Sequence, residues 1–217
     1  MGEAELIKHT NQLLINAVII IYGDAASDEL ATCIAADIAH YWNEAQGKVM
    51  IRKQQFNVRF NITGACDRSL TPLTVYENTD PRNNYFRIEE YAAGNISFVD
   101  GLNSNTGYLK LDNLLHDSTT AAHEFGHTLG LDHPHTLDIR GKGRPGIMYP
   151  RGTIVDHIYQ YDANALPGSN GGTINPAFRK VLQKDIDELR LHKLDFNDAG
   201  RAMVGSFTSI WHDRHQQ

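Results

Sequence analysis

The chain predicts an α+β fold, and three features of its apolar pattern support that prediction. An apolar, β-branched run at residues 13–22 precedes a long amphipathic stretch at residues 27–47. Short alternating segments follow between residues 56 and 113, and helical spacing returns only after residue 118. Elements in this order favour a strand-rich upper part and a loop-rich lower part. The 217 residues, 41% of them hydrophobic, suit a single domain, residues 1–217, with a sizeable core.

The first two elements are a strand and a helix. Leu13–Tyr22 holds four β-branched residues in a row, which favours a buried strand. In the helix that follows, Ser27 can cap the first turn, and Asp28 and Glu29 suit the positive end of the helix dipole. Gly47 can end the helix. Apolar residues recur at helical spacing along one face: Leu30, Ile34, Ile38, Tyr41 or Trp42, and Ala45.

Several strands are expected in the middle of the chain. Phe56–Thr63 alternates apolar and polar residues, which is the pattern of a strand with one buried face. Leu73–Glu77 and Tyr85–Glu90 are weaker strand candidates. Asn95–Gly101 and Gly107–Asn113 predict two short strands joined by a turn-rich link.

The second half of the chain predicts two helices with an irregular segment between them. The first is expected from about Ser118 to Gly130, capped by Asp117 or by Ser118 itself. Residues 131–175 have little periodicity, and a loop of that length in a compact domain is usually functional. The last clear helix covers Asn175–Lys193, and the tail after it is either a short helix or a strap over the surface.

The stretch HEFGHTLGLDH carries the chemistry of the chain. On a helix, His123 and His127 lie one turn apart and can direct two imidazoles at one ion. Glu124 is adjacent to that face and can reach a water molecule on the ion. Gly130 can take the left-handed conformation that ends the helix, so that His133 approaches as a third ligand. Three protein nitrogens leave a fourth zinc position for water, which is the catalytic pattern.

Two other interpretations of this stretch stay open: a helix with solvated histidines, or a structural zinc clip. A structural site more often completes its ligand shell with cysteines, and none lies near the motif. Cys33 and Cys66 are compatible with one disulfide or with two buried free thiols. His116, His135 and His157 are expected to be loop residues rather than ligands.

The composition argues against some classes of partner. The net charge of −6 is modest and the basic residues are scattered, so no nucleic-acid partner is expected. The apolar run at residues 13–22 is too short to span a membrane. It follows Glu3, Glu5 and Lys8 rather than a basic start, and no cleavage site comes after it, so no signal peptide is expected in this chain.

HEFGHTLGLDH resembles the long zinc signature of the metzincin metalloproteases, and Gly146–Pro150, GIMYP, is similar to their Met-turn. The resemblance implies a twisted mixed sheet, two long helices above a cleft, and a loop-rich lower lobe with a C-terminal helix. The upper lobe would cover about residues 1–133 and the lower lobe about residues 134–217. Met148 would form a hydrophobic base under the zinc ligands.

The same resemblance implies the walls of the substrate cleft. A strand at one edge would pair with an extended protein or peptide substrate. Residues 140–175 would shape the pocket for the side chain just after the scissile bond. The likeness further implies a secreted monomer. The cleft residues implied in this way are Ile96, Ser97, Phe98, Val99, Tyr149 and Pro150.

Features of different metzincin subfamilies are mixed in this chain. Pro134 after the third histidine is similar to serralysin-like enzymes, whereas the letters MYP are similar to matrix metalloproteases. Pro150 stands where serralysins and astacins carry a tyrosine, so the role of that tyrosine cannot be assigned here. The oxygen-rich stretch Asp100–Asn105 could hold calcium, but its spacing matches no standard loop and favours an ordinary turn.

The sequence therefore predicts a zinc-dependent endopeptidase with one catalytic Zn²⁺ on His123, His127 and His133, and with Glu124 as general base. One alternative is a narrow-specificity processing protease or toxin-type effector domain released from a larger protein. The other is a zinc-binding module with vestigial activity, which the intact Glu124 disfavours.

Overall fold

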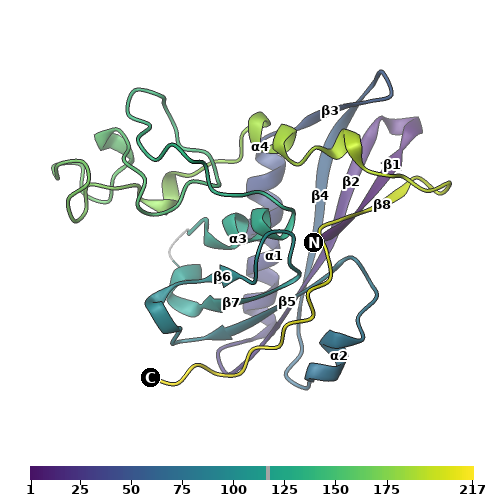
Figure 1. The fold of residues 1–217 in the computed structure, drawn as a ribbon, viewed down its shortest axis with the longest axis horizontal. Helices are drawn as coiled ribbons and strands as arrows, with labels where there is room; N and C mark the ends of the chain where they lie inside the picture. The colour runs from purple at the N-terminus through teal and green to yellow at the C-terminus, as the bar shows by residue number, and fades with distance from the viewer. Residues whose placement is uncertain (116–117) are drawn as a thin grey trace.

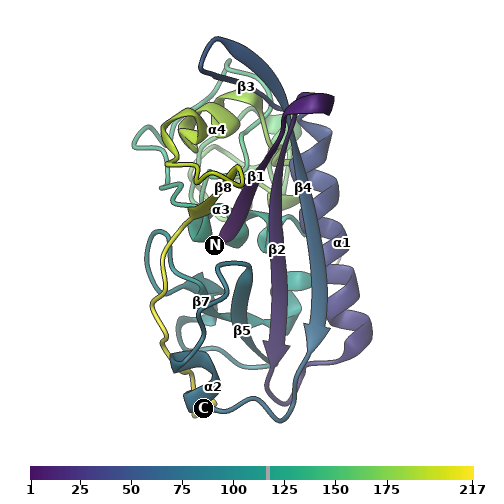
Figure 2. The ribbon, with the colours of Figure 1, turned by 90° about the vertical axis from the view of Figure 1, so that its right-hand side faces the viewer.

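The computed structural model describes residues 1–115 and 118–217. It shows a curled mixed sheet with the long helix α1 (Asp28–Glu44) packed along one face (Figures 1 and 2). The irregular residues 134–175 form a lobe that projects from one side of this body (Figure 1). The mixed sheet agrees with the expected α+β class, whereas only one of the two expected long helices is long.

The centre of the sheet is β2 (Gln12–Tyr22), which includes the predicted strand Leu13–Tyr22. Along one side, β4 (Gln54–Cys66) runs parallel to nearly the whole of β2. On the other side, β1 (Gly2–Ile7) pairs antiparallel with the first half of β2, and β5 (Asn83–Glu89) pairs parallel with the second half. Inward-facing apolar residues of β2 and β4 are buried, whereas their neighbours are more exposed, as alternation predicts.

Shorter strands complete the sheet. β3 (Lys48–Ile51) pairs antiparallel with β4, and β8 (Arg201–Val204) pairs antiparallel with β1. On the other side, β7 (Thr106–Lys110) runs parallel to β5, and β6 (Phe98–Val99) pairs antiparallel with β7 and ends the sheet order. The predicted pair of short strands is therefore present. The sequence did not predict β1, β3 or β8, because short strands fixed by long-range pairing need no strong local pattern.

Helix α1 begins as the sequence predicted but ends earlier. The side chain of Ser27 accepts a hydrogen bond from Leu30 N at 3.1 Å, which caps the first turn. The last helical residue is Glu44, and Gln46 rather than Gly47 takes a positive φ. Gly47 is required for another reason: a Cβ there would lie 2.8 Å from the side chain of Ile186.

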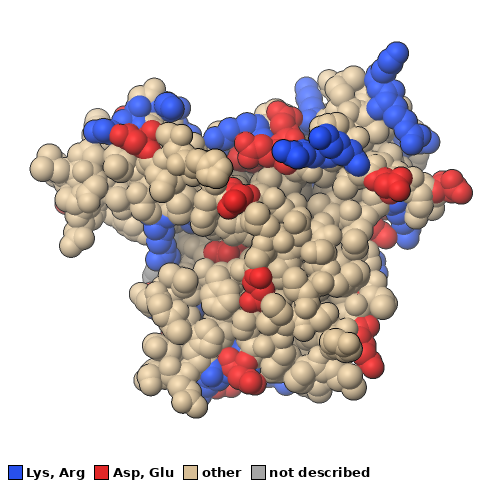
Figure 3. Space-filling model, viewed as in Figure 1, with Lys and Arg blue, Asp and Glu red and all other residues tan. Residues whose placement is uncertain are grey.

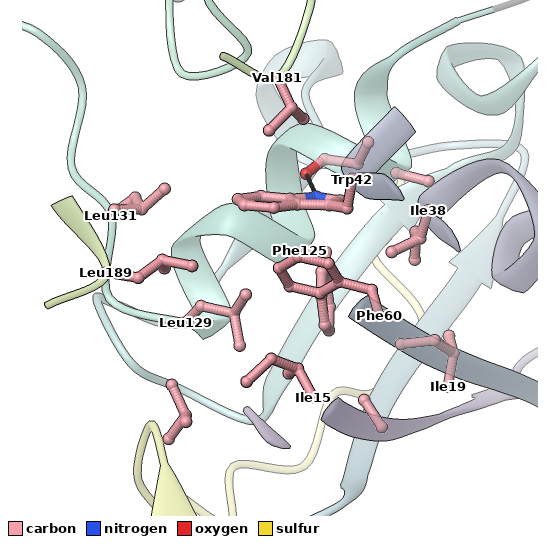
Figure 4. Close-up of a cluster of buried hydrophobic side chains, with 14 of the residues drawn as sticks. Ile15, Ile19, Ile38, Trp42, Phe60, Phe125, Leu129, Leu131, Val181 and Leu189 are labelled. Atoms are coloured by element: carbon pink, nitrogen blue, oxygen red, sulfur yellow. Dashed lines mark hydrogen bonds between the residues drawn. The ribbon is translucent and has the colours of Figure 1, made fainter. Parts of the chain in front are cut away.

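The main core lies between α1, the sheet and the helix α3 (Thr120–Thr128) (Figure 4). Trp42, Phe60 and Phe125 pack together there, and Trp42 Nε1 donates to Ala122 O at 3.0 Å. The same core includes Val181, Ile186 and Leu189 from beyond the irregular segment. Segments before and after the irregular residues 134–175 thus contribute to one apolar cluster.

One predicted strand is a helix. Leu73–Glu77 was expected to be extended, but the structure has the short helix α2 (Pro72–Tyr76) there. Thr71 accepts from Thr74 N at 3.2 Å, and Pro72 supplies a preset φ in the first turn. These start signals outweigh the strand preference of Val75 and Tyr76.

The predicted closing helix Asn175–Lys193 is broken into short pieces: a 3₁₀ turn (Pro176–Phe178), an extended stretch, α4 (Gln183–Glu188) and a second 3₁₀ turn (Leu191–Lys193). The break is at Arg179, whose buried side chain binds groups on other segments. Asp185 then starts α4 by accepting from Leu182 N at 2.7 Å. Helical periodicity alone could not show these long-range contacts.

Helix α3 is shorter than the predicted Ser118–Gly130, and it has nine residues against the 17 of α1. The side chain of Ser118 accepts from Thr120 N at 3.2 Å. The other predicted cap, Asp117, and the predicted loop residue His116 lie outside the described residues.

The projecting lobe has its own small core, in which Ile139, Val155 and Ile174 are buried. Isolated backbone bridges and a 3₁₀ turn (His157–Tyr159) hold it, so it is ordered without long helices or strands.

The chain after β8 crosses the surface as a strap, which is one of the two alternatives for the tail. Trp211 stacks on Tyr22 with ring centroids 4.5 Å apart. Cys33 is exposed, Cys66 is half-buried, and they are free cysteines, so the disulfide alternative is wrong and the thiols are not buried as expected. Among the described residues, no helix is long and apolar enough to cross a membrane.

Candidate metal centre and cleft

The three histidines of the motif come together at one point. His123 and His127 extend from α3, and His133 arrives from the turn after it. His133 Nε2 lies 3.1 Å from Nε2 of His123 and 3.1 Å from Nε2 of His127. A tetrahedral Zn²⁺ with Zn–N bonds of about 2.0–2.1 Å separates its ligand nitrogens by about 3.3 Å, so this spacing fits one ion.

Backbone carbonyls orient two of these rings. His123 Nδ1 lies 2.8 Å from Ile147 O, and His127 Nδ1 lies 2.7 Å from Leu131 O. A carbonyl oxygen only accepts hydrogen bonds, so each Nδ1 must carry the proton and donate. Each Nε2 then keeps its lone pair for a metal ion.

The electrostatic surroundings keep the three imidazoles neutral. Burial lowers the pKa of all three, and lowers that of His123 well below its usual value. The charge of Arg179 acts in the same direction on each ring. Neutral imidazole is the metal-binding form, so the donor set suits a divalent cation.

The turn after α3 depends on Gly130. Its φ of 96° lies in the left-handed region, which side chains with a Cβ rarely adopt. Gly130 N donates to His127 O and Leu131 N donates to Gly126 O, both at 3.0 Å. A Cβ on Gly130 would also collide with the side chain of Asn103. This tight turn brings His133 back toward the helix.

Met148 lies in a buried turn that packs on α3. A Cβ on Gly126 would collide with Met148 Sδ, so the glycine allows the methionine to approach the helix between the two histidines. The neighbouring Ile147 supplies the carbonyl that orients His123. The turn therefore contacts the site through both a side chain and the backbone.

Glu124 lines the same cleft as the histidines, with 6% of its surface exposed. Burial raises the pKa of its carboxyl group to about 8, while the charges of Arg179 and Arg151 act in the opposite direction. A carboxyl group with a pKa near neutrality can both take up and release a proton.

The cleft has a volume of about 460 Å³ and opens to solvent beside the histidines. Figure 3 shows the hollow between the projecting lobe and the body. Of the predicted cleft residues, Ile96, Ser97, Phe98, Val99 and Pro150 line it. Tyr149 packs instead in the small core of the projecting lobe, with Lys184 Nζ 4.9 Å from its ring centroid.

Sequence reasoning missed several residues of the cleft: Gly101, Leu102, Asn113, Thr120, Asp132, Arg151 and Arg179. Arg179 left no distinctive signal, because charged residues between Phe178 and Val181 are the ordinary pattern of the predicted amphipathic helix.

The remaining polar candidates are elsewhere. His135 is exposed, and His157 begins a 3₁₀ turn in the projecting lobe. Asp100 of the calcium candidate accepts hydrogen bonds from His212 Nε2 at 2.8 Å and from Thr106 Oγ1 at 2.5 Å. These contacts stabilise an ordinary turn, and calcium binding there stays a prediction.

Comparisons with known proteins give distant structural likenesses, two of which are described below. No family model matches the chain, and no curated protein matches it. Myroilysin is similar with a TM-score of 0.39 and 13% identity, over 89% of this chain and 100% of that one. Archaemetzincin from Methanopyrus kandleri is similar with a TM-score of 0.38 and 11% identity, over 82% of this chain and 95% of that one. These likenesses are too distant to place the chain in a family, so the chemistry of the site rests on its own geometry.

Proposed function

We propose that the protein is a zinc-dependent endopeptidase of the metzincin type. The observation that carries this proposal is the convergence of three imidazole Nε2 atoms beside the carboxyl group of Glu124 in an open cleft. His123, His127 and His133 would hold the ion. The turn at Met148, packed under α3, supports the finer assignment to the metzincin type.

The residues of the cleft suit hydrolysis of a peptide bond. Bound Zn²⁺ polarises a carbonyl group and lowers the pKa of a water molecule toward neutrality. Glu124 takes a proton from the attacking water and then donates it to the leaving amine nitrogen. Its buried carboxyl group, with a raised pKa, is suited to both transfers.

The edge of the sheet can position the substrate. β6 is the last strand in the sheet order and its residues Phe98 and Val99 line the cleft. An extended peptide can pair with such an edge through backbone hydrogen bonds, which bind a chain largely independently of its side chains. This geometry favours an endopeptidase that holds its substrate on both sides of the scissile bond.

The decisive experiment uses the substitution Glu124→Ala. It should leave zinc content unchanged, because Glu124 is not a ligand, and reduce kcat/KM on casein by on the order of 10²–10⁴-fold. Zinc content is measured by elemental mass spectrometry, and activity with and without a chelator. Glu90→Ala is the matched control, since Glu90 is exposed and outside the cleft. Near wild-type cleavage by Glu124→Ala would contradict the proposal.

A further inference from the structure

Two arginines line the cleft next to Glu124. Arg179 is 3% exposed, and Arg151 is exposed on the projecting lobe. Figure 3 shows Lys or Arg atoms on the lobe's side of the hollow. Two acidic residues, Glu124 and Asp132, line the same cleft, so its walls carry charges of both signs.

The surrounding protein holds these guanidinium groups through hydrogen bonds to uncharged acceptors, and the nearby Glu124 forms no direct ion pair with either of them. Arg179 Nε donates to Thr119 Oγ1 at 2.9 Å and Nη1 donates to Tyr149 O at 3.2 Å. Arg151 Nη2 donates to Asn113 Oδ1 at 2.7 Å. All three acceptors are uncharged. Within residues 1–115 and 118–217, no carboxylate forms an ion pair with either arginine.

Burying a cation that forms no direct ion pair is costly. Burial lowers the pKa of Arg179 to about 10, while the charge of Glu124 acts in the opposite direction. In the described part of the chain, the Nη2 group of Arg179 has no hydrogen-bond acceptor. The Nη2 group of Arg179 therefore offers free N–H donors, and a planar guanidinium matches a carboxylate best.

The position of Glu124 decides which part of a substrate would meet these arginines. The general base must lie beside the leaving amine nitrogen in order to protonate it. Arg179 Nε binds Thr119, the residue directly before α3, and both arginines line the same cleft as Glu124. The residue that contributes the leaving nitrogen, which is the one just after the scissile bond, would therefore lie in the part of the cleft that Glu124 and the two arginines share.

We propose that Arg179 and Arg151 form a carboxylate-binding subsite for the residue that follows the scissile bond. The carboxylate is either the side chain of an aspartate or glutamate, or the free C-terminus of the substrate. The inference rests on the proposed protease function and adds its substrate class. Arg179 is the fixed, buried half of the subsite, and Arg151 is its exposed half.

The first experiment compares peptides that differ only in the residue after the scissile bond. Glutamate should be preferred to glutamine by about ten- to a hundredfold in kcat/KM, because a charge-assisted hydrogen bond contributes about 1.5–3 kcal/mol. A second pair of peptides ends one residue after the scissile bond, as a free acid or as an amide. If glutamate is preferred in the first pair, the subsite binds an acidic side chain. If the free acid is preferred in the second pair, the subsite binds the C-terminal carboxylate of the substrate.

Substitutions then test the subsite itself. Arg151→Glu should remove the preference for the acid and favour a lysine peptide instead, and Arg151→Ala should give an intermediate result. Arg59→Glu is the matched control, because Arg59 is exposed on β4 and outside the cleft. Arg179→Gln tests the buried half. Its kinetics are interpreted only if circular dichroism shows a native fold. If Arg179→Gln does not fold, the Arg151 variants alone decide the outcome.

A binding measurement separates this inference from the proposed function. Fluorescence anisotropy of the same labelled peptides on the Glu124→Ala protein needs no turnover. Chelator-sensitive cleavage with no preference for the acid in either pair would overturn the subsite and leave the protease function intact. Absence of any cleavage would overturn the protease function. In that case, equal binding of acid and amide peptides would overturn the subsite as well.

Discussion

In the body of the molecule, β2 and β4 pair along nearly their whole length and α1 covers them, whereas residues 134–175 are held by isolated bridges and turns. The body has a large apolar cluster that includes Trp42 and Phe125. The projecting lobe has a cluster with three buried apolar residues. Regular strand pairing and a large core make the body rigid, whereas the projecting lobe is stabilised by fewer contacts.

This contrast matches the division of the site. The body supplies α3 with two of the three histidines and Glu124, whose geometry would have to be fixed for the proposed metal binding and proton transfer. The projecting lobe supplies Pro150 and Arg151, which line the other side of the cleft. A rigid scaffold that carries the chemistry and a loop region that carries recognition is a common arrangement.

The largest expected effect comes from removing one isoleucine side chain in each region. Ile19→Ala in β2 should lower the free energy of unfolding by about 2–5 kcal/mol, because Ile19 is fully buried in the main core. Ile174→Ala should cost about 2 kcal/mol, the low end of the same range, because its cluster is small. Urea unfolding of the metal-free protein measures both.

The same pair separates stability from recognition. Ile174→Ala should change kcat/KM for peptides more than Ile19→Ala does, since the lobe around Ile174 shapes the cleft. If the two variants lost the same free energy of unfolding and had the same kcat/KM, the body and the projecting lobe would behave as one uniformly stable unit.

The next effect concerns pH and Asp185, which anchors α4 behind the lobe. Burial raises the pKa of its carboxyl group from 3.8 to about 6. A raised folded-state pKa adds stability that is fully present below about pH 3.8 and is lost as the pH rises through about 6, with a total of about 3 kcal/mol. The stability of Asp185→Asn should therefore rise relative to wild type over this window. Parallel pH–stability curves of the metal-free proteins would contradict this assignment.

Local sequence pattern predicted the parts of the fold that local pattern determines. β2, α1 and β4 have strong periodicity, and Ser27 has a capping role that follows from its neighbours alone. The helix over 175–193 was wrong because Arg179 binds Thr119, far away in the sequence. Contacts of that kind leave almost no trace in a window of neighbouring residues.

The same distinction holds for the candidate site. The convergence of His123 and His127 follows from helix geometry, so their spacing in the sequence is informative by itself. The carbonyl of Ile147 and the charge of Arg151 reach the site only because a distant turn folds against α3. Ile147 and Arg151 are single residues that form no regularly spaced motif, so the sequence alone does not reveal their role.

A smaller effect is expected at the junction of the two regions. Gly130→Ala should cost about 1–2 kcal/mol in strain at its positive φ, and more for the collision with Asn103. It should also weaken zinc binding by displacing His133, measured by competition with a chromophoric chelator. Gly143→Ala is the control, because Gly143 has a φ of 82° with no atom near its added Cβ. Equal zinc affinities in the two variants would exclude a role of the turn in metal binding.

The smallest expected effect concerns the two cysteines of the body. A disulfide between Cys33 and Cys66 would stabilise the fold by about 2–4 kcal/mol, and its loss would be obvious in unfolding experiments. Because both thiols are free, with Cys33 exposed and Cys66 half-buried, the double substitution Cys33→Ser and Cys66→Ser should change the free energy of unfolding by less than about 0.5 kcal/mol. A reducing agent should likewise leave the urea midpoint of the wild type unchanged. If either treatment lowered the midpoint strongly, the body would depend on a covalent link rather than on its sheet and core alone, and the contrast with the projecting lobe would need a different physical basis.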